Sequence, residues 1–222
     1  MALKHILFDN DGTIVDSEII ASRIMLRHLK HHGFSISEPE YNMRFPGLRT
    51  RDILIALREE EGFMPPENFI HQVHEEHNQE FHRSLRAIPG MTSLFRSLKI
   101  PKSMVSNGSV RHVDTCLRRV KLRSAVDGHI FSAEQVGSPK PSPDVYLYAL
   151  EILRLKPSET LVVEDSVTGV MAAKSAGIQV VGFLAATHIH DGHGDKLQAA
   201  GADFLIPDAK ALHSLLKKKG AV

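Results

Sequence analysis

Two aspartates near the start of the chain have types and spacing suited to catalysis. Asp9 and Asp11 follow the apolar run at residues 5–8, and Gly12 and Thr13 come directly after them. Carboxylates two residues apart at the end of a strand can converge on one metal ion or one reacting group. Because Asp and Gly are also common in ordinary turns after strands, a plain turn is an equal alternative for this segment alone.

A second pair of acids, Glu164 and Asp165, follows the apolar run at residues 161–163. Adjacent carboxylates at the end of a strand repel one another unless a cation lies near them. Their hard oxygen atoms, with no thiolate and no imidazole beside them in the sequence, favour Mg²⁺ over zinc. The alternative for this segment alone is a helix N-terminus, where Asp and Ser are favoured caps.

Two further clusters could bind a phosphate group. Ser106, Asn107 and Gly108 stand where a strand-like run leads into a helical pattern, and hydroxyl, amide and backbone N–H groups at a helix N-terminus form a ready phosphate site. Lys140 precedes Pro141 in a proline-rich loop, where it is stiffer than a surface lysine and could neutralise charge. The alternative for residues 106–108 alone is an ordinary capping turn, which is equally favoured. The alternative for Lys140 alone is a solvated loop lysine.

Phosphoryl transfer needs all four clusters together, as a nucleophile, a metal site, phosphate donors and a cation. An anionic nucleophile is repelled by an anionic phosphate, so Mg²⁺ and a lysine must offset that repulsion. Aspartate is an established nucleophile in this role and forms an aspartyl-phosphate. The four clusters therefore predict a magnesium-dependent phosphohydrolase that acts on a small phosphorylated metabolite.

The four clusters need a scaffold that brings them together, and the apolar pattern supplies one. Short apolar runs recur along the chain, and helical patterns alternate with them. The runs cover residues 5–8, 103–105, 129–131, 160–163, 179–183 and 203–206. This pattern predicts a parallel sheet covered on both faces, which is the doubly wound α/β (Rossmann-like) fold. Ligands of such sheets bind outside the carboxyl ends of the strands, where the four clusters fall.

One segment breaks the alternation of strands and helices. Residues 17–86 carry only helical periodicity, with one helix ending near Gly33, a second ending near Gly62, and a third covering about residues 67–85 after two prolines. We expect an all-helical cap at residues 17–86, inserted into an α/β catalytic core of residues 1–16 and 87–222.

In sequence order, the four clusters resemble the four motifs of the haloacid dehalogenase superfamily of phosphatases. The matching segments are Asp9-x-Asp11-Gly12-Thr13, Ser106-Asn107-Gly108, Lys140-Pro141 and Glu164-Asp165. The resemblance spans nearly the whole chain, including the helical cap. Within the superfamily, the stretch from Glu164 to Gly169 is similar to the sugar-phosphate phosphatase and β-phosphoglucomutase group.

The resemblance implies roles for the first motif. Asp9 would be the nucleophile and a metal ligand. Asp11 would be the general acid/base, first protonating the leaving oxygen and then activating water, and its main-chain carbonyl would also bind Mg²⁺. Thr13 would help to orient Asp11. The dehalogenases of the superfamily lack the second aspartate, so Asp11 favours phosphate chemistry.

The other three motifs acquire roles in the same way. Ser106 and Asn107, together with Lys140, would hold the transferring phosphoryl group, and Lys140 would also balance the charge on the nucleophile. Asp165 would be a metal ligand, and Glu164 would bind the metal directly or through water. The resemblance thus implies Mg²⁺ as the cofactor.

Three other functions are alternatives at this point. β-Phosphoglucomutases carry a histidine in the first cap helix and a lysine before a cap-loop glycine. Here residues 17–22 contain no histidine, and Pro46 stands before Gly47. A non-enzymatic phospho-acceptor, such as a receiver domain, lacks a helical insertion after its first strand. A catalytically silent protein that binds a phosphorylated ligand is a further alternative, although every catalytic position is filled.

The cap loop offers candidate substrate contacts at Arg44, Gly47, Arg49 and Arg51. Planar guanidinium groups can bind vicinal hydroxyls or a carboxylate. A sugar phosphate or sugar-acid phosphate is therefore favoured over a nucleotide, and the alternative is a solvated loop.

Composition excludes several classes of partner. The net charge is +1, so no polyanion-binding surface is indicated and we expect no nucleic-acid partner. No run of apolar residues is long enough to span a membrane. With no leader pattern and one cysteine, we expect a cytoplasmic protein that is a monomer or a weak dimer.

The cysteine and the histidines are further candidates for a reactive or metal-binding site. Cys116 lies in a helical apolar pattern and is interpreted as a buried structural thiol. The 14 histidines include two groups with short spacing, at positions 71, 74 and 77 and at positions 188, 190 and 193. Neither spacing matches a zincin helix, and we expect solvated side chains at both.

Overall fold

The computed structural model describes residues 2–45, 48, 50–127 and 129–222. The chain divides into two units, one formed by Met1–Asp16 with Arg86–Val222 and the other by Ser17–Leu85. None of the helices in the described ranges is long and apolar enough to cross a membrane.

The first unit is built on a six-stranded sheet with the order β3-β2-β1-β4-β5-β6, and all neighbouring strands are parallel. The strands are β1 (His5–Phe8), β2 (Lys102–Ser106), β3 (Ile130–Ser132), β4 (Thr160–Glu164), β5 (Gln179–Phe183) and β6 (Phe204–Ile206). The prediction of a doubly wound parallel sheet is confirmed. The strand order reverses between β1 and β4, which makes the carboxyl ends of these two strands the expected ligand site.

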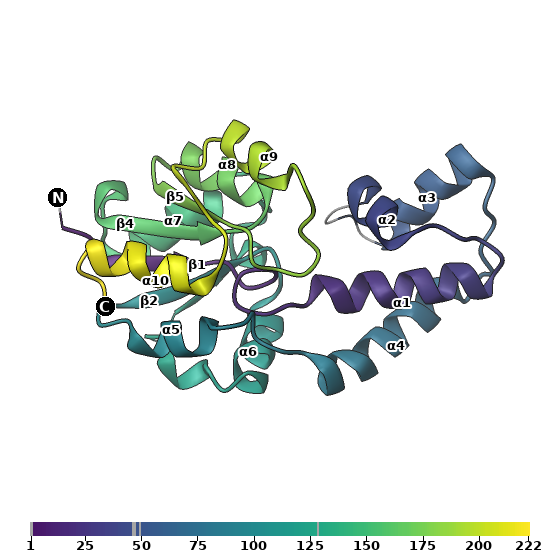
Figure 1. Ribbon diagram of the computed structural model, residues 1–222, viewed down its shortest axis with the longest axis horizontal. Helices are drawn as coiled ribbons and strands as arrows, with labels where there is room; N and C mark the ends of the chain where they lie inside the picture. Colours follow the sequence, from purple (N-terminus) through teal and green to yellow (C-terminus); the bar gives the residue numbers. More distant parts are fainter. Residues whose placement is uncertain (1, 46–47, 49, 128) are drawn as a thin grey trace. The chain divides into compact units, whose positions relative to one another are not determined.

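Helices cover both faces of this sheet because successive strand residues point to opposite sides. On one face, Leu7, Val105 and Val162 pack with buried residues of α7 (Asp144–Leu153) and α8 (Val167–Ser175). On the other, the ring of Phe8 lies 5.0 Å from that of Phe95 in α5 (Met91–Ser97). The remaining helices of this unit are α6 (Val110–Arg119), α9 (His193–Ala199) and α10 (Ala209–Lys218) (Figure 1).

The second unit contains the helices α1 (Glu18–His31), α2 (Glu38–Arg44), α3 (Thr50–Glu61) and α4 (Phe69–Ser84) (Figure 1). Phe69 is wholly buried and its ring contacts those of His28, His32 and Phe63. The sequence predicts α1, α3 and α4 but not α2. That helix is one short stretch, capped by the Ser37 hydroxyl, which accepts from Glu40 N at 3.3 Å, and its apolar pattern is too short to reveal a period.

His5 gives the sheet a measurable dependence on pH. The residue is 5% exposed, and its Nε2 lies 3.0 Å from Ser103 Oγ. Burial lowers the pKa of His5 from 6.5 to about 4. Below pH 6.5 the unfolded chain takes up a proton that the folded chain does not bind, so stability falls as the pH drops towards 4.

We expect the free energy of unfolding to fall by about 2 kcal/mol between pH 7 and pH 5 through this residue alone. Urea denaturation of the wild type and His5→Gln at both pH values measures the effect. The variant should lose about 2 kcal/mol less than the wild type. His71→Gln, which removes an 80% exposed histidine, serves as the control. Equal losses in wild type and His5→Gln would contradict the assignment.

Candidate active site

The carboxyl ends of β1 and β4 bring three acids together. Phe8 pairs with Val163, and Asp9 N donates to Val163 O at 3.0 Å. Asp9, Glu164 and Asp165 are all buried. Each offers a carboxylate oxygen, and these three atoms lie within 4.8 Å of one another. The two acidic clusters of the sequence thus form one site at the reversal of the strand order.

The turn after β1 is shaped by a close contact with the second acidic pair. Gly12 has φ +80°, and a Cβ there would overlap the Asp165 carboxylate, so only glycine fits both the backbone and the space. Thr13 is wholly buried, and its hydroxyl donates to Asp165 Oδ1 at 3.2 Å. The hydroxyl proton of Thr13 is thus directed to Asp165, and the role of Thr13 in orienting Asp11 stays a prediction.

Lys140 reaches the same site as a buried cation. Its Nζ donates to Asp9 Oδ1 at 2.7 Å, to Glu164 Oε1 at 2.6 Å and to Val105 O at 2.9 Å. Burial alone would lower the pKa of Lys140, but the carboxylates of Asp9 and Glu164 outweigh it and hold the pKa well above its usual value. The lysine therefore stays charged beside the predicted nucleophile.

Asn107 fixes the loop that carries this lysine. Lys140 N donates to Asn107 Oδ1 at 2.8 Å, and Asn107 Nδ2 donates to Lys140 O at 3.4 Å. Ser106, the last residue of β2, is buried, and its hydroxyl accepts from Gly108 N at 2.9 Å. The structure thus ties the second and third predicted motifs directly to each other.

Glu164 is wholly buried, and each of its carboxylate oxygen atoms accepts hydrogen bonds. Oε1 accepts from Lys140 Nζ and from Tyr146 OH at 3.3 Å. Oε2 accepts from Ser166 N at 3.1 Å and from Ser166 Oγ at 2.9 Å. Gly169 stands against this carboxylate, where a Cβ would overlap it. Glu164 thus orients the lysine, and sequence reasoning did not single out Tyr146 or Ser166 as its partners.

The charges of the cluster fit a divalent cation. Burial raises the pKa of Asp9 and of Asp165 well above the usual value, and the neighbouring acids add to the effect. Three carboxylates here face one lysine, so a further positive charge would stabilise their ionised forms. The donors offered are all oxygen atoms, which is the ligand set that Mg²⁺ requires.

The sequence pattern of the haloacid dehalogenase-like hydrolase family matches residues 6–183. The chain belongs to this family. That range begins in β1 and ends in β5, and it contains all four predicted motifs. The predicted membership is confirmed, and with it the prediction that the protein is a phosphatase.

Two curated relatives of this haloacid dehalogenase-like hydrolase are phosphatases by name. The phosphorylated carbohydrates phosphatase of Thermotoga maritima is 31% identical over 96% of this chain and 98% of its own length. The 6-phosphogluconate phosphatase of Escherichia coli is 27% identical over 84% of this chain and 85% of its own.

Solved structures share the fold across the whole chain. A haloacid dehalogenase-like protein of unknown function from Agrobacterium tumefaciens is 32% identical, with a TM-score of 0.91 over 99% of this chain and 100% of that one. A protein from Thermotoga maritima described as a putative β-phosphoglucomutase is 31% identical, with a TM-score of 0.79 over 97% and 99%.

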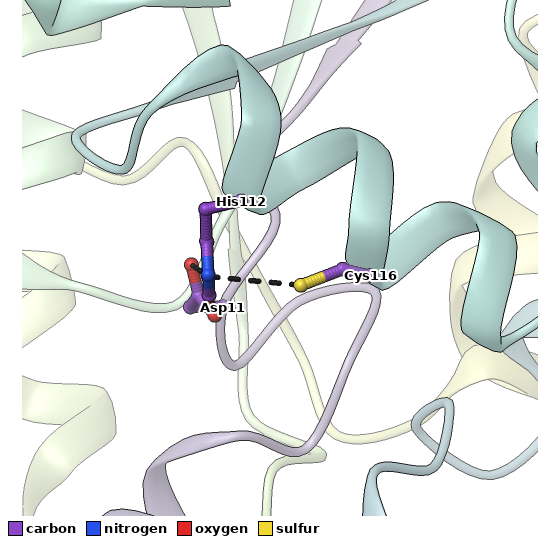
Figure 2. Close-up of side chains that lie close together, drawn as sticks. All are labelled: Asp11, His112 and Cys116. Atoms are coloured by element: carbon purple, nitrogen blue, oxygen red, sulfur yellow. Dashed lines mark hydrogen bonds and ion pairs between the residues drawn. The ribbon is translucent and has the colours of Figure 1, made fainter. Parts of the chain in front are cut away.

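In this hydrolase Asp11 has a partner that sequence reasoning missed (Figure 2). His112 Nε2, from the first turn of α6, lies 3.1 Å from Asp11 Oδ1 and 3.2 Å from Oδ2. This hydrogen bond raises the pKa of His112 from 6.5 to about 10. The only signal in the sequence is the position of His112 after the Ser106–Asn107 motif, because the contact spans about a hundred residues.

The histidines near the C-terminal end are partly corrected by the structure. His193 is buried, and its Nε2 lies 2.6 Å from the backbone oxygen of Asp165. His188 Nε2 lies 3.4 Å from Asp165 Oδ2. The expectation of a solvated side chain is therefore wrong for His193, whereas His71 is exposed as expected.

The cap residues predicted to contact substrate have different surroundings. The Arg44 guanidinium forms ion pairs with Glu40, Glu60 and Glu61 at 3.2, 2.8 and 3.1 Å. Arg44 thus links α2 to α3 within the cap, and its role as a substrate contact stays a prediction. Arg51 is exposed at the start of α3, and Gly47 and Arg49 lie outside the described residues.

Proposed function

We propose that this protein is a Mg²⁺-dependent phosphohydrolase that removes phosphate from a sugar phosphate or sugar-acid phosphate through an aspartyl-phosphate. The observation that carries the proposal is the buried Lys140, which donates to Asp9 and Glu164 at the point where β1 and β4 meet. A lysine held charged against the attacking carboxylate offsets the repulsion between that carboxylate and a phosphate.

In the first half of the reaction, an Asp9 carboxylate oxygen forms a bond to phosphorus while the bond from phosphorus to the leaving oxygen breaks. Asp11 gives that oxygen its proton. In the second half, Asp11 takes a proton from water as the water attacks phosphorus, and Asp9 is released. Ser106, Asn107 and Lys140 hold the phosphoryl group throughout.

The metal would be held by the Asp9 and Asp165 carboxylates and by the Asp11 main-chain carbonyl, with Glu164 adding its charge directly or through water. Bound there, Mg²⁺ supplies positive charge to the phosphate oxygens and fixes their orientation. Thr13 and Gly12 maintain the position of the Asp165 carboxylate.

The names of the relatives support the proposed class of substrate. One is a phosphatase of phosphorylated carbohydrates, and the other acts on 6-phosphogluconate, a phosphorylated sugar acid. Arg44, Gly47, Arg49 and Arg51 remain our proposed contacts for the part of the substrate that leaves. An arginine there would bind vicinal hydroxyls or a carboxylate.

Activity against a panel of phosphorylated metabolites tests the proposed class of substrate. We expect sugar or sugar-acid phosphates to have the highest kcat/KM. For the best substrate, Arg49→Ala and Arg51→Ala should each lower kcat/KM by about tenfold or more, which is the cost of losing a hydrogen bond to a charged group. Arg58→Ala, an exposed arginine of the same helix α3, is the control and should change little. A ranking led by nucleoside monophosphates would contradict the proposed substrate.

The same panel decides between a hydrolase and a mutase, since one structural relative carries a putative mutase name. β-Glucose 1-phosphate and its bisphosphate activator should yield free phosphate and glucose. Accumulation of the 6-phosphate without free phosphate would instead identify a mutase.

A further inference from the structure

Asp11, His112 and Cys116 bring a carboxylate, an imidazole and a thiol to one point (Figure 2). His112 Nε2 lies 3.1 and 3.2 Å from the two Asp11 oxygen atoms and 3.6 Å from Cys116 Sγ. A tetrahedral zinc ion, with bonds of about 2.1 Å to nitrogen or oxygen and about 2.3 Å to sulfur, holds its ligand atoms about 3.3–3.6 Å apart. The separations from His112 Nε2 to the other two groups are therefore close to those that zinc would impose, and all three ligand atoms lie within 4.8 Å of one another.

Helix α6 supplies two of the three side chains, and the turn after β1 supplies Asp11. His112 and Cys116 are four residues apart on α6, so their side chains lie on one face of the helix. The Ser109 hydroxyl caps α6 by accepting from His112 N at 3.1 Å. The imidazole ring also lies against Gly108, where an added Cβ would come within 2.9 Å of His112 Cδ2. Glycine at this position leaves room for the ring beside Asp11.

An ion could reach the three side chains from one side. Cys116 is wholly buried, whereas the side chains of His112 and Asp11 are 33% and 25% exposed. The thiol therefore forms the base of the site, and the carboxylate and imidazole form its open rim. A thiolate and an imidazole select zinc and similar metals over Mg²⁺, unlike the all-oxygen cluster at Asp9 and Asp165.

We propose that Asp11, His112 and Cys116 form a second, inhibitory metal site that takes Zn²⁺. When the ion binds, His112 Nε2 and Cys116 Sγ each release a proton to solvent, and both atoms and an Asp11 oxygen become ligands. Water fills the fourth position. The inhibition rests on the proposed function, because an Asp11 carboxylate bound to zinc no longer transfers protons. Metal binding itself does not depend on that function.

Co²⁺ is the probe for the site, because a cobalt–thiolate bond gives a charge-transfer absorption in the near ultraviolet. Cys116 is the sole cysteine of the chain, so that absorption can arise from no other residue. With excess Mg²⁺ present, the wild type should show the absorption, and Zn²⁺ should remove it by displacing Co²⁺. No thiolate absorption in the wild type would overturn the proposal.

Variants locate the ligands. Cys116→Ser and His112→Gln should each lose the absorption. Each should also weaken Zn²⁺ binding by more than about 100-fold, because the loss of even an indirect metal partner can cost that much. His71→Gln, at an exposed histidine, and Asp165→Asn, at the oxygen cluster, should both retain the absorption. Persistence of the absorption in His112→Gln would overturn the ligand assignment.

Activity measurements complete the test. In excess Mg²⁺, Zn²⁺ should inhibit the wild type, and Cys116→Ser should keep its basal activity while needing at least about tenfold more Zn²⁺ for the same inhibition. Equal inhibition of the two proteins would overturn the inhibitory role. A protein that shows the cobalt absorption but hydrolyses no phosphate ester would contradict the proposed function and leave the metal site standing.

Discussion

Replacing Asp9 by asparagine should lower kcat by about 10⁴-fold or more while the protein remains folded. An amide is a far weaker nucleophile than a carboxylate and a weaker metal ligand. The fold should survive, because Lys140 keeps its hydrogen bonds to Glu164 Oε1 and Val105 O, and burial already disfavours the Asp9 charge. Phosphate release from the best substrate measures the loss, and circular dichroism checks folding.

Asp195→Asn is the matched control, since it makes the same chemical change at an exposed residue of α9. It should leave kcat within about twofold, as is usual for surface substitutions. Retention of more than a few per cent of the activity by Asp9→Asn would remove Asp9 from the role of nucleophile.

Removal of divalent metal should have the second largest effect. EDTA should reduce turnover to the background rate, and Mg²⁺ should restore it, because Asp9, Glu164 and Asp165 crowd three acids around one lysine. Ca²⁺ should inhibit, since its larger radius and looser coordination would misplace the nucleophile.

Asp165→Asn tests whether the metal binds at the cluster of Asp9, Glu164 and Asp165. It removes one carboxylate but leaves the lysine and its hydrogen bonds in place, so the Mg²⁺ concentration for half-maximal activity should rise by about tenfold or more. Full activity in metal-free buffer would contradict the assignment of this cluster to Mg²⁺.

The sequence predicts the sheet well because its strands are apolar on both faces. Residues 5–8 and 160–163 are all buried, and each of these two runs ends where an acidic cluster begins. The strand order is harder to predict from the sequence, because parallel pairing joins segments that are far apart in the chain, such as β1 and β4. Helix α2 escapes prediction because seven residues are too few to show a helical period.

The candidate site is predictable in its outline but not in its supporting contacts. Asp9 directly follows β1 and Glu164 ends β4, where position alone indicates chemistry, and Lys140 lies in the loop between β3 and α7. The partners of Asp11 and Asp165 do not stand at strand ends, because His112 lies inside a helix and His193 follows a loop. Their contacts depend on how α6 and α9 pack beside the sheet, which no local pattern specifies. Thr13 lies near Asp9 and Asp11 in the sequence, but in the structure its hydroxyl donates to the distant Asp165.

The phosphorylated enzyme provides the most direct test of the account. Asp11→Asn should still be phosphorylated by p-nitrophenyl phosphate, whose leaving group needs no proton, but should lack the base that activates water. Acid-quenched protein is then digested and analysed by mass spectrometry. We predict one added phosphoryl group on the peptide that contains Asp9, with none in Asp9→Asn. A phosphoryl group on any other residue, or turnover in the wild type with no phosphorylated protein under any quench, would contradict the central claim.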